Sequence, residues 1–326
     1  MKLPRRQFLH LAVGAAALPA VSRIAWAQVY PSRPITMIVP ALAGGAPDTI
    51  GRFVAERMRG SLGQPIIIEN VSGASGSIGT GRAARARPDG YTIDIGFNSS
   101  HALNGALYSL RYDVLNDFEP ISPLVMGPTV FYARKTMPAK DLNELIAWLK
   151  ANPNKASAGI GASSLRLINA FLQKETGAQF TFVPYRGTAP AMQDLVAGQI
   201  DLLITNLDVL PLVRGGITKA YAVTSDPRFA QAPDIPTFAE MGVPEVFWSS
   251  WMGLFAPRRT PRDIIGKLNA AAVEALADPL VRSRIADLGY DTVPRERQTP
   301  ETLAGFQKAD AEKWWPIIKE LGLKAE

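Results

Sequence analysis

The chain has 326 residues, with 35 lysines and arginines against 29 acidic residues, 47% hydrophobic residues, two histidines and no cysteine. This length and apolar content predict a globular protein with two domains and exclude disordered, coiled-coil and collagen-like classes. The absence of cysteine excludes disulfides, iron–sulfur clusters, zinc–thiolate sites and cysteine nucleophiles. Because histidine is also scarce, we expect no metal site and no cofactor.

The first 27 residues have the pattern of an export signal. Three basic residues precede an apolar stretch over residues 8–21, and the segment ends in an A-x-A sequence at residues 25–27. This pattern is typical of a secretory signal peptide cleaved after Ala27, and the stretch is too short to span about 30 Å of hydrocarbon. Residues 5–9 (RRQFL) resemble the twin-arginine motif, although Pro4 stands where serine is commonest. Twin-arginine export to the periplasm is therefore favoured, with general secretion as the alternative.

The leader also explains much of the chain's positive charge. It contains four basic residues and no acid, whereas the whole chain has a net charge of +6. The remaining residues form no dense basic stripe of the kind that binds nucleic acid. We therefore expect no nucleic-acid partner.

Apolar runs alternate with helical patterns along the rest of the chain. We expect strands at residues 35–39, 66–69, 91–95, 130–133, 180–183, 201–204, 220–223 and 247–255, and helices at 48–62, 141–151, 189–197 and from about 261, 279 and 300. Buried runs without polar alternation, separated by helices, indicate parallel sheets covered on both faces. The fold class is α/β.

The order of these elements predicts two lobes, each with a mostly parallel sheet covered by helices. Lobe 1 is expected to comprise residues 28–128 plus 249–326, and lobe 2 residues 129–248. The helical tail has too few strands for a sheet of its own, so it is expected to pack back on lobe 1. The chain then crosses between the lobes twice, near residues 127–129 and 246–249, and the aromatic run 247–255 forms the second crossing.

Four loops at the carboxyl ends of expected strands could hold an anion. They cover residues 40–49, 158–164, 184–190 and 205–208. Ligands of open α/β sheets collect at this edge, where helix N-termini offer free N–H groups worth about 0.3–1 kcal/mol toward an anion. Three of these loops also have a structural interpretation. Residues 40–49 would be a tight turn with Asp48 as helix cap, Ser163 or Ser164 would cap a helix, and Arg186 would be a solvated surface residue.

Catalytic motifs are weak. Residues 79–84 fit G-x-G-x-x-A but lie too far from the preceding strand for a dinucleotide site, and residues 73–77 fail the last position of G-x-S-x-G. His101 is the only histidine after the leader, and without an identifiable nucleophile it is interpreted as a hydrogen-bonded cap residue.

Taken together, short segments along the whole mature chain resemble the substrate-binding proteins of tripartite tricarboxylate transporters, the Bug receptor family. The segments are residues 38–48, 62–70, 86–91, 107–118, 183–190, 198–201, 222–225, 236–240 and 253–257. The resemblance implies a periplasmic, monomeric, hinge-closing receptor of the type II Venus-flytrap kind. Such a receptor delivers a small mono- or dicarboxylate to membrane transporter subunits.

The same resemblance assigns ligand contacts to both lobes. They are Ala41, Gly44, Gly45, Asp48, Ser99 and Ser100 in lobe 1, and Ala162, Ser163, Ser164, Arg186, Gly187, Thr188 and Asn206 in lobe 2.

The sequence departs from the family pattern at three places. Leu165-Arg166 replaces a common histidine position, Thr205-Asn206 replaces Asp-Asn, and Ala41 stands where phenylalanine is usual. These changes favour a more negative or an aromatic acid over an amine-bearing amino acid. The alternative function is a periplasmic lyase or hydrolase acting on an organic acid, and a sensory role would use the same site.

Overall fold

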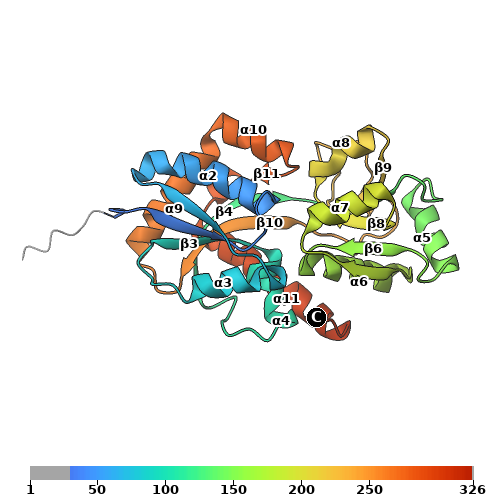
Figure 1. The fold of residues 1–326 in the computed structure, drawn as a ribbon, viewed down its shortest axis with the longest axis horizontal. Coiled ribbons are helices and arrows are strands. Elements are labelled where there is room, and N and C mark those ends of the chain that lie inside the picture. Colours follow the sequence, from blue (N-terminus) through green and yellow to red (C-terminus); the bar gives the residue numbers. More distant parts are fainter. Residues whose placement is uncertain (1–29, 325–326) are drawn as a thin grey trace, which may run out of the picture.

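A computed structural model describes residues 30–324, so the export signal lies outside the described residues. Two separate β-sheets, each covered by helices, form two lobes that lie side by side (Figure 1). The α/β, two-lobed prediction is confirmed. Lobe 1 is the name used below for the six-stranded sheet and its helices, and lobe 2 for the five-stranded sheet and its helices.

The lobe 1 sheet has the strand order β11-β4-β10-β3-β1-β2. Its strands are β1 (Ile35–Val39), β2 (Ile66–Asn70), β3 (Thr92–Phe97), β4 (Phe118–Gly127), β10 (Ser250–Pro257) and β11 (Asp291–Thr292). β1 runs parallel to β2 and β3, whereas β10 is antiparallel to β3 and β4. The tail strand β10 thus lies between β3 and β4, two strands from the first 127 residues of the chain.

The lobe 2 sheet has the order β7-β6-β8-β5-β9. Its strands are β5 (Val130–Arg134), β6 (Ser157–Ile160), β7 (Thr181–Pro184), β8 (Leu202–Thr205) and β9 (Thr218–Val223). β6 is parallel to β7 and β8, and β5 is antiparallel to β8 and β9. Both sheets are therefore mixed, with most strands pointing one way and a minority running against them.

The helices predicted at residues 48–62, 141–151 and 189–197, and those from about 261, 279 and 300, correspond to α2, α5, α7, α9, α10 and α11, whereas no range was predicted for α3, α4, α6 or α8. They are α2 (Ala46–Leu62), α3 (Ser77–Ala84), α4 (Asn104–Leu107), α5 (Leu142–Ala151), α6 (Ser163–Thr176), α7 (Thr188–Ala197), α8 (Leu210–Arg214), α9 (Arg262–Ala277), α10 (Pro279–Asp287) and α11 (Pro300–Glu320). In α2, Ile50, Val54 and Met58 are fully buried at four-residue spacing, as expected for one face of an amphipathic helix. The left-handed Gly63 ends that helix.

The ten-residue strand β4 is absent from the sequence prediction because it contains Pro120 and Pro123. Proline cannot donate to a β-ladder and normally argues against an interior strand. In the structure these prolines lie opposite Phe255 and Gly253 of β10, where the register between the two strands shifts. The sheet accommodates both prolines at these irregularities.

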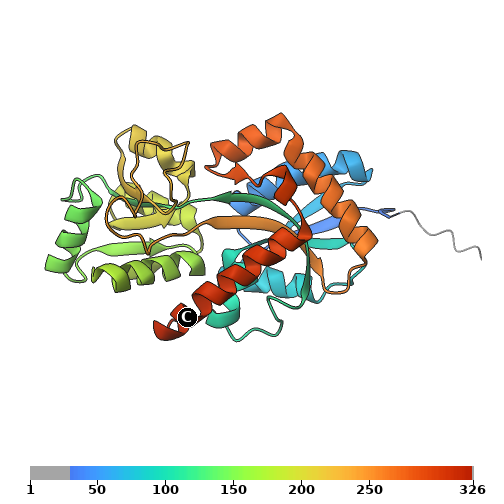
Figure 2. The same cartoon turned by 180° about the vertical axis from the view of Figure 1, so that it is seen from behind.

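Helix α11 runs diagonally from lobe 1 to lobe 2 (Figure 2). Near its C-terminal end Trp314 packs edge-on against Phe171 of α6, with ring centroids 5.5 Å apart. Glu320, the last residue of α11, forms an ion pair with Lys174 of α6 at 2.8 Å. Within residues 30–324 no helix combines the length and apolar character needed to cross a membrane.

Candidate functional site

The predicted site residues follow strands that point toward the other lobe. In lobe 1 they follow β1 (residues 40–48) and β3 (residues 98–100), and in lobe 2 they follow β6, β7 and β8. Because β1 and β3 run in the same direction, as do β6 and β7, their carboxyl ends share one edge of each sheet. The two edges meet between the lobes.

Two hydrogen bonds join these edges directly. The Ser164 N–H donates to Ser99 Oγ at 3.1 Å, and Ser163 Oγ donates to Asn104 Oδ1 at 2.7 Å. Ser99, Ser163 and Asn104 are all buried. The predicted serines of lobe 1 and lobe 2 are therefore in contact, although they are separated by more than sixty residues of sequence.

The glycine-rich loops pack so closely that side chains are excluded. A Cβ atom at Gly161 would lie 2.6 Å from the carbonyl carbon of Gly187 and 2.7 Å from the Thr188 nitrogen. Gly187 itself has φ +150° and faces Leu42 of lobe 1, whose Cδ1 would be 3.5 Å from an added Cβ. The loops after β6 and β7 thus touch each other, and the second approaches the loop after β1.

Three helices begin in this region without a side-chain cap. Their N-cap residues are Gly45 for α2, Ala162 for α6 and Gly187 for α7, and none of them caps its helix through a side chain. The first N–H groups of an α-helix have no partner within the helix, and its N-terminus carries about half a positive charge. Such helix starts suit a carboxylate or another anion.

Asp48 organises the lobe 1 loop instead of facing open space. It is 3% exposed, and its carboxylate accepts from the Gly44 N–H at 2.8 Å, from Asn70 Nδ2 at 3.0 Å and from Arg52. Burial alone would raise the pKa of Asp48, but these bonds from Arg52, Gly44 and Asn70 bring the pKa below its usual value. The interpretation of Asp48 as helix N-cap is wrong, because the N-cap is Gly45.

The other lobe 1 glycines are also engaged locally. The Gly44 N–H is bound to Asp48, and the Gly45 N–H donates to the Leu42 carbonyl at 3.3 Å. Gly44 has φ +81°, which favours glycine there. Ala41 is half-buried, and its carbonyl accepts from Asn70 Nδ2 at 3.4 Å. These residues shape the loop that leads into α2.

Arg186 and Arg166 are placed very differently. Arg186 is exposed in the loop before α7, and within residues 30–324 its guanidinium makes no hydrogen bond or ion pair. Arg166 instead donates to the Lys324 carbonyl near the end of α11 at 2.9 Å. The inference that Arg166 adds positive charge at the ligand therefore loses its support, because its guanidinium is directed to the chain end. Beside it, Leu165 is 6% exposed within the hydrophobic core.

Thr188 and Asn206 are half-buried at the starts of their segments. Thr188 is the first residue of α7, and Asn206 precedes the 3₁₀ turn Leu207–Val209. The Asn206 carbonyl accepts from the Tyr132 hydroxyl at 3.1 Å. This bond ties the segment after β8 to the neighbouring strand β5.

Ser100 and His101 point into the core. Ser100 Oγ lies 3.0 Å from His101 Nδ1 and bonds both the Phe97 N–H and carbonyl, while His101 Nε2 lies 3.3 Å from Asp94 Oδ2. Burial lowers the pKa of His101 to about 3 and raises the pKa of Asp94 well above its usual value. All three side chains are fully buried, so this Ser–His–Asp arrangement is closed to a substrate.

The expectations for these two residues change accordingly. His101 lies in the π-helical turn Ser99–Leu103 and stacks on Phe255 at 4.2 Å, so it is a core residue and not a helix cap. Ser100 was predicted to contact the ligand, but its hydroxyl is turned inward. Only Ser99 of this pair reaches lobe 2.

Asn104 is a residue that the sequence prediction missed. It is fully buried; its Nδ2 donates to the Ser75 carbonyl at 3.0 Å and to Ser77 Oγ at 2.9 Å, while its Oδ1 accepts from Ser163. One amide thus connects the start of α3 with the start of α6. No sequence signal marks it, because it lies in a segment without a predicted element or loop motif.

Two sheets whose ligand-side edges meet across crossing strands define a two-lobed binding protein. The chain also matches the model of the tripartite tricarboxylate transporter family receptor over residues 50–323. It is 35% identical to protein BugT of Bordetella pertussis over 303 residues, which cover 91% of this chain and 92% of BugT.

Solved structures of similar proteins have the same fold. MatC from Rhodopseudomonas palustris with bound malate is 36% identical, with a TM-score of 0.84 over 89% of this chain and 100% of that one. R. palustris Rpa4515 with adipate is 31% identical, with a TM-score of 0.83 over 90% of this chain and 99% of that one. The protein belongs to the tripartite tricarboxylate transporter receptor family, and the resemblance noted from its sequence is confirmed.

Proposed function

We propose that this receptor captures a small organic acid between its two lobes in the periplasm and delivers it to the membrane subunits of a tripartite transporter. The observation that carries the proposal is the meeting of three helix starts, those of α2, α6 and α7, at the junction of the lobes, where no N-cap residue provides a side-chain cap. Malate and adipate, bound by MatC and Rpa4515, are both dicarboxylates. A mono- or dicarboxylate is therefore the proposed ligand, with an aromatic acid as one variant.

The proposed contacts divide into two kinds. Direct contacts come from the N–H groups at the start of α7, from those at the start of α6 other than the Ser164 N–H, from Arg186, and from the side chains of Thr188 and Asn206. Asp48, Gly44, Gly45, Ala41 and Ser100 support the loops from behind, because their polar groups already have protein partners. Ser99, Ser163 and Ser164 hold the lobes together around the bound acid.

The energetics of such a site are sufficient for tight binding. Micromolar affinity corresponds to about −8 kcal/mol. Hydrogen bonds to a charged group contribute about 1.5–3 kcal/mol each, so several of them can supply this after the entropy of association is lost. Closure of lobe 2 (residues 129–248) over lobe 1 (residues 28–128 plus 249–326) would remove water from the anion and strengthen each bond.

The alternative function, a lyase or hydrolase, has one structural feature in its favour. Ser100, His101 and Asp94 have the residue types of a hydrolytic triad, but their burial leaves no route for a substrate. Family membership argues in the same direction, because the family consists of transport receptors. We therefore propose that the protein is not an enzyme.

A ligand panel tests the proposal. Thermal unfolding is followed with malate, adipate, acetate and benzoate, and with putrescine, a cation without a carboxylate, as the control. A bound acid stabilises the protein by RT ln(1 + [L]/Kd), so we expect at least one acid to raise the melting temperature and putrescine to have no effect. A flat response to every acid contradicts the proposal. Mass spectrometry of the recovered acid separates binding from turnover, since a receptor returns it unchanged.

A further inference from the structure

The second crossing between the lobes is held at two points. On the lobe 2 side Thr224 Oγ1 donates to the Trp248 carbonyl at 2.8 Å, and the Trp248 N–H donates to the Thr224 carbonyl at 3.1 Å. Thr224 Oγ1 also accepts from the N–H of Thr129, at the first crossing, at 2.9 Å. Both crossing segments are therefore fixed to each other where they enter lobe 2.

On the lobe 1 side the same crossing is held by Asn98. Its Oδ1 accepts from the Trp251 N–H at 2.8 Å, and its Nδ2 donates to the Ser249 carbonyl at 3.3 Å. Ser249 thus directly follows the lobe 2 attachment at Trp248, and its own carbonyl already belongs to the lobe 1 attachment. A rotation of one lobe against the other has to be absorbed there and at Pro128 of the first crossing.

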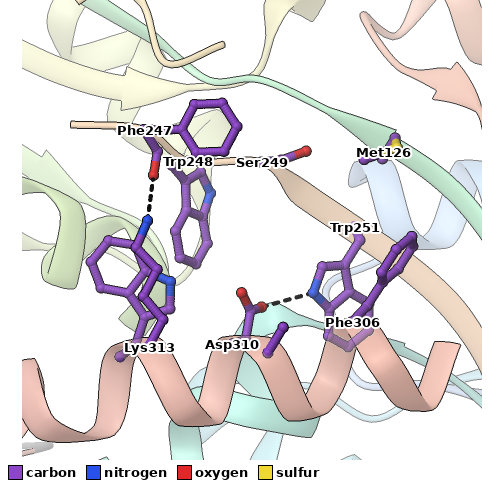
Figure 3. A pocket seen from close by; sticks show the side chains of 10 residues that line it. Met126, Phe247, Trp248, Ser249, Trp251, Phe306, Asp310 and Lys313 are labelled. Carbon is purple, nitrogen blue, oxygen red and sulfur yellow. Dashed lines mark hydrogen bonds between the residues drawn. The ribbon is translucent and has the colours of Figure 1, made fainter. Parts of the chain in front are cut away.

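Helix α11 supports this lobe 1 attachment through a single carboxylate oxygen. Asp310 Oδ2 accepts from Trp251 Nε1 at 2.7 Å (Figure 3). The same oxygen accepts from Asn98 Nδ2 at 2.6 Å. One turn further on, Lys313 Nζ donates to the Phe247 carbonyl at 3.2 Å. Asp310, Lys313 and Trp251 line a cavity of about 190 Å³ behind the crossing strand, together with Trp248, Phe306 and Trp314.

The Asp310 contacts lead directly to the junction between the lobes. Asn98, which Asp310 holds, immediately precedes Ser99, and Ser99 accepts the Ser164 N–H from lobe 2. The path from α11 to lobe 2 therefore runs through one carboxylate, one amide and one hydroxyl. The carboxylate is the only charged group on this path.

We propose that Asp310 is a positioning residue that sets the balance between open and closed lobes by fixing Asn98, and with it Ser99, against the crossing strand. This inference rests on the proposed function only in assuming that the lobes open. Loss of the carboxylate leaves the buried Trp251 Nε1 without its acceptor and leaves Asn98 Nδ2 with the Ser249 carbonyl alone, at 3.3 Å. Asn98 is then held less firmly, and the Ser99–Ser164 contact weakens.

The opening of the lobes can be measured without any ligand. Because the chain has no cysteine, spin labels at Glu56→Cys on α2 and Gln193→Cys on α7 go only to those two exposed positions. Double electron–electron resonance then gives the distribution of distances between the lobes. We expect Asp310→Ala to shift the distribution toward longer distances and to broaden it.

Matched variants separate positioning from a general effect on folding. Asp310→Asn should keep the wild-type distribution, because its amide oxygen can accept both hydrogen bonds in the place of Oδ2. Trp251→Phe removes the second donor to Asp310 Oδ2, so the carboxylate that holds Asn98 is itself less firmly placed. This variant should shift the distribution in the same direction as Asp310→Ala but by less, and it provides the test if Asp310→Ala does not fold. Glu312→Ala, an exposed acid on the same helix, should have no effect.

Two outcomes decide the inference. Identical distributions for wild type, Asp310→Ala and Trp251→Phe would overturn it. A shift in Asp310→Ala that Asp310→Asn restores supports it, even if malate and adipate both fail to bind the wild type, a result that would count only against the proposed ligand. Where an acid does bind, we expect Asp310→Ala to raise its Kd about tenfold by calorimetry.

Discussion

The backbone N–H of Ser164 donates to the side chain of Ser99 at 3.1 Å, which joins the start of α6 in lobe 2 to the end of β3 in lobe 1. This bond exists only while the two lobes are in contact. The bond therefore stabilises the closed arrangement of the lobes and not the fold of either lobe.

Ser99→Ala should weaken ligand binding with little change in thermal stability. A neutral hydrogen bond contributes about 0.5–1.5 kcal/mol, so we expect the Kd for a bound acid to rise about 3- to 10-fold by calorimetry. Ser109→Ala, at an exposed position in the same segment, is the control and should bind like the wild type. An unchanged Kd in Ser99→Ala would remove this bond from the closure mechanism.

Arg186→Ala should weaken binding more strongly. An exposed guanidinium that has no partner among residues 30–324 can pair with the ligand carboxylate, and charge-assisted bonds of about 1.5–3 kcal/mol correspond to a loss of about 10- to 100-fold in affinity. Arg186→Lys should recover part of it, because the charge remains but the planar fork is lost. Arg295→Ala, an exposed arginine in lobe 1, serves as the control. Equal affinities for all three variants by calorimetry would strike Arg186 from the site.

Asp310→Asn should change how stability depends on pH. Burial raises the pKa of Asp310 to about 6, while hydrogen bonds from Trp251 and Asn98 and the charge of Lys313 oppose the rise. Because the pKa is higher in the folded protein than in the unfolded one, the wild type loses stability as pH rises from about 4 to about 6.

Asp310→Asn has no carboxyl group at this position to ionise, so it does not lose this stability as the pH rises. The free energy of unfolding of Asp310→Asn relative to wild type should therefore increase by on the order of 2 kcal/mol between about pH 4 and pH 7, measured by urea unfolding. Glu312→Gln, exposed on the same helix, should show no such trend. A constant difference between variant and wild type across this range would contradict the raised pKa.

Gly161→Ala should destabilise the protein and weaken binding, because the new Cβ would lie 2.6–2.7 Å from the backbone of Gly187 and Thr188. Gly60→Ala makes the same chemical change within α2, where nothing lies within 4 Å. Alanine favours a helix over glycine by about 0.5–1 kcal/mol, so Gly60→Ala should raise the melting temperature. Equal melting temperatures for the two variants would show that the contact at Gly161 is not tight.

The local sequence pattern was enough to predict most of the strands and helices. The strand at residues 35–39 and the helix starts near Pro279 and Pro300 agree with β1, α10 and α11, because buried runs and caps are signals that act over a few residues. β4 was missed for an equally local reason, since Pro120 and Pro123 oppose a strand until the irregular pairing with β10 accommodates them. The predicted fold class, α/β with two lobes, needed only the order of these elements.

The site was predictable as a set of loops but not as a set of contacts. Glycine-rich turns after strands marked Gly44, Gly187 and their neighbours, and Arg186 stood out as a fixed charge. Nothing in the sequence distinguished Ser99, which reaches the other lobe, from Ser100, which turns into the core beside His101. The direction of a side chain is decided by what packs around it.

The sequence by itself therefore determined the family, the alternation of strands and helices, and the loops that open toward a ligand, because each is written in residues close together in the chain. Only the tertiary structure decided that Asp48 is fully engaged by its neighbours, that Asn104 bridges the lobes and that Asp310 holds the crossing strand. These roles depend on partners that lie far away in sequence and meet only when the two sheets and α11 have come together.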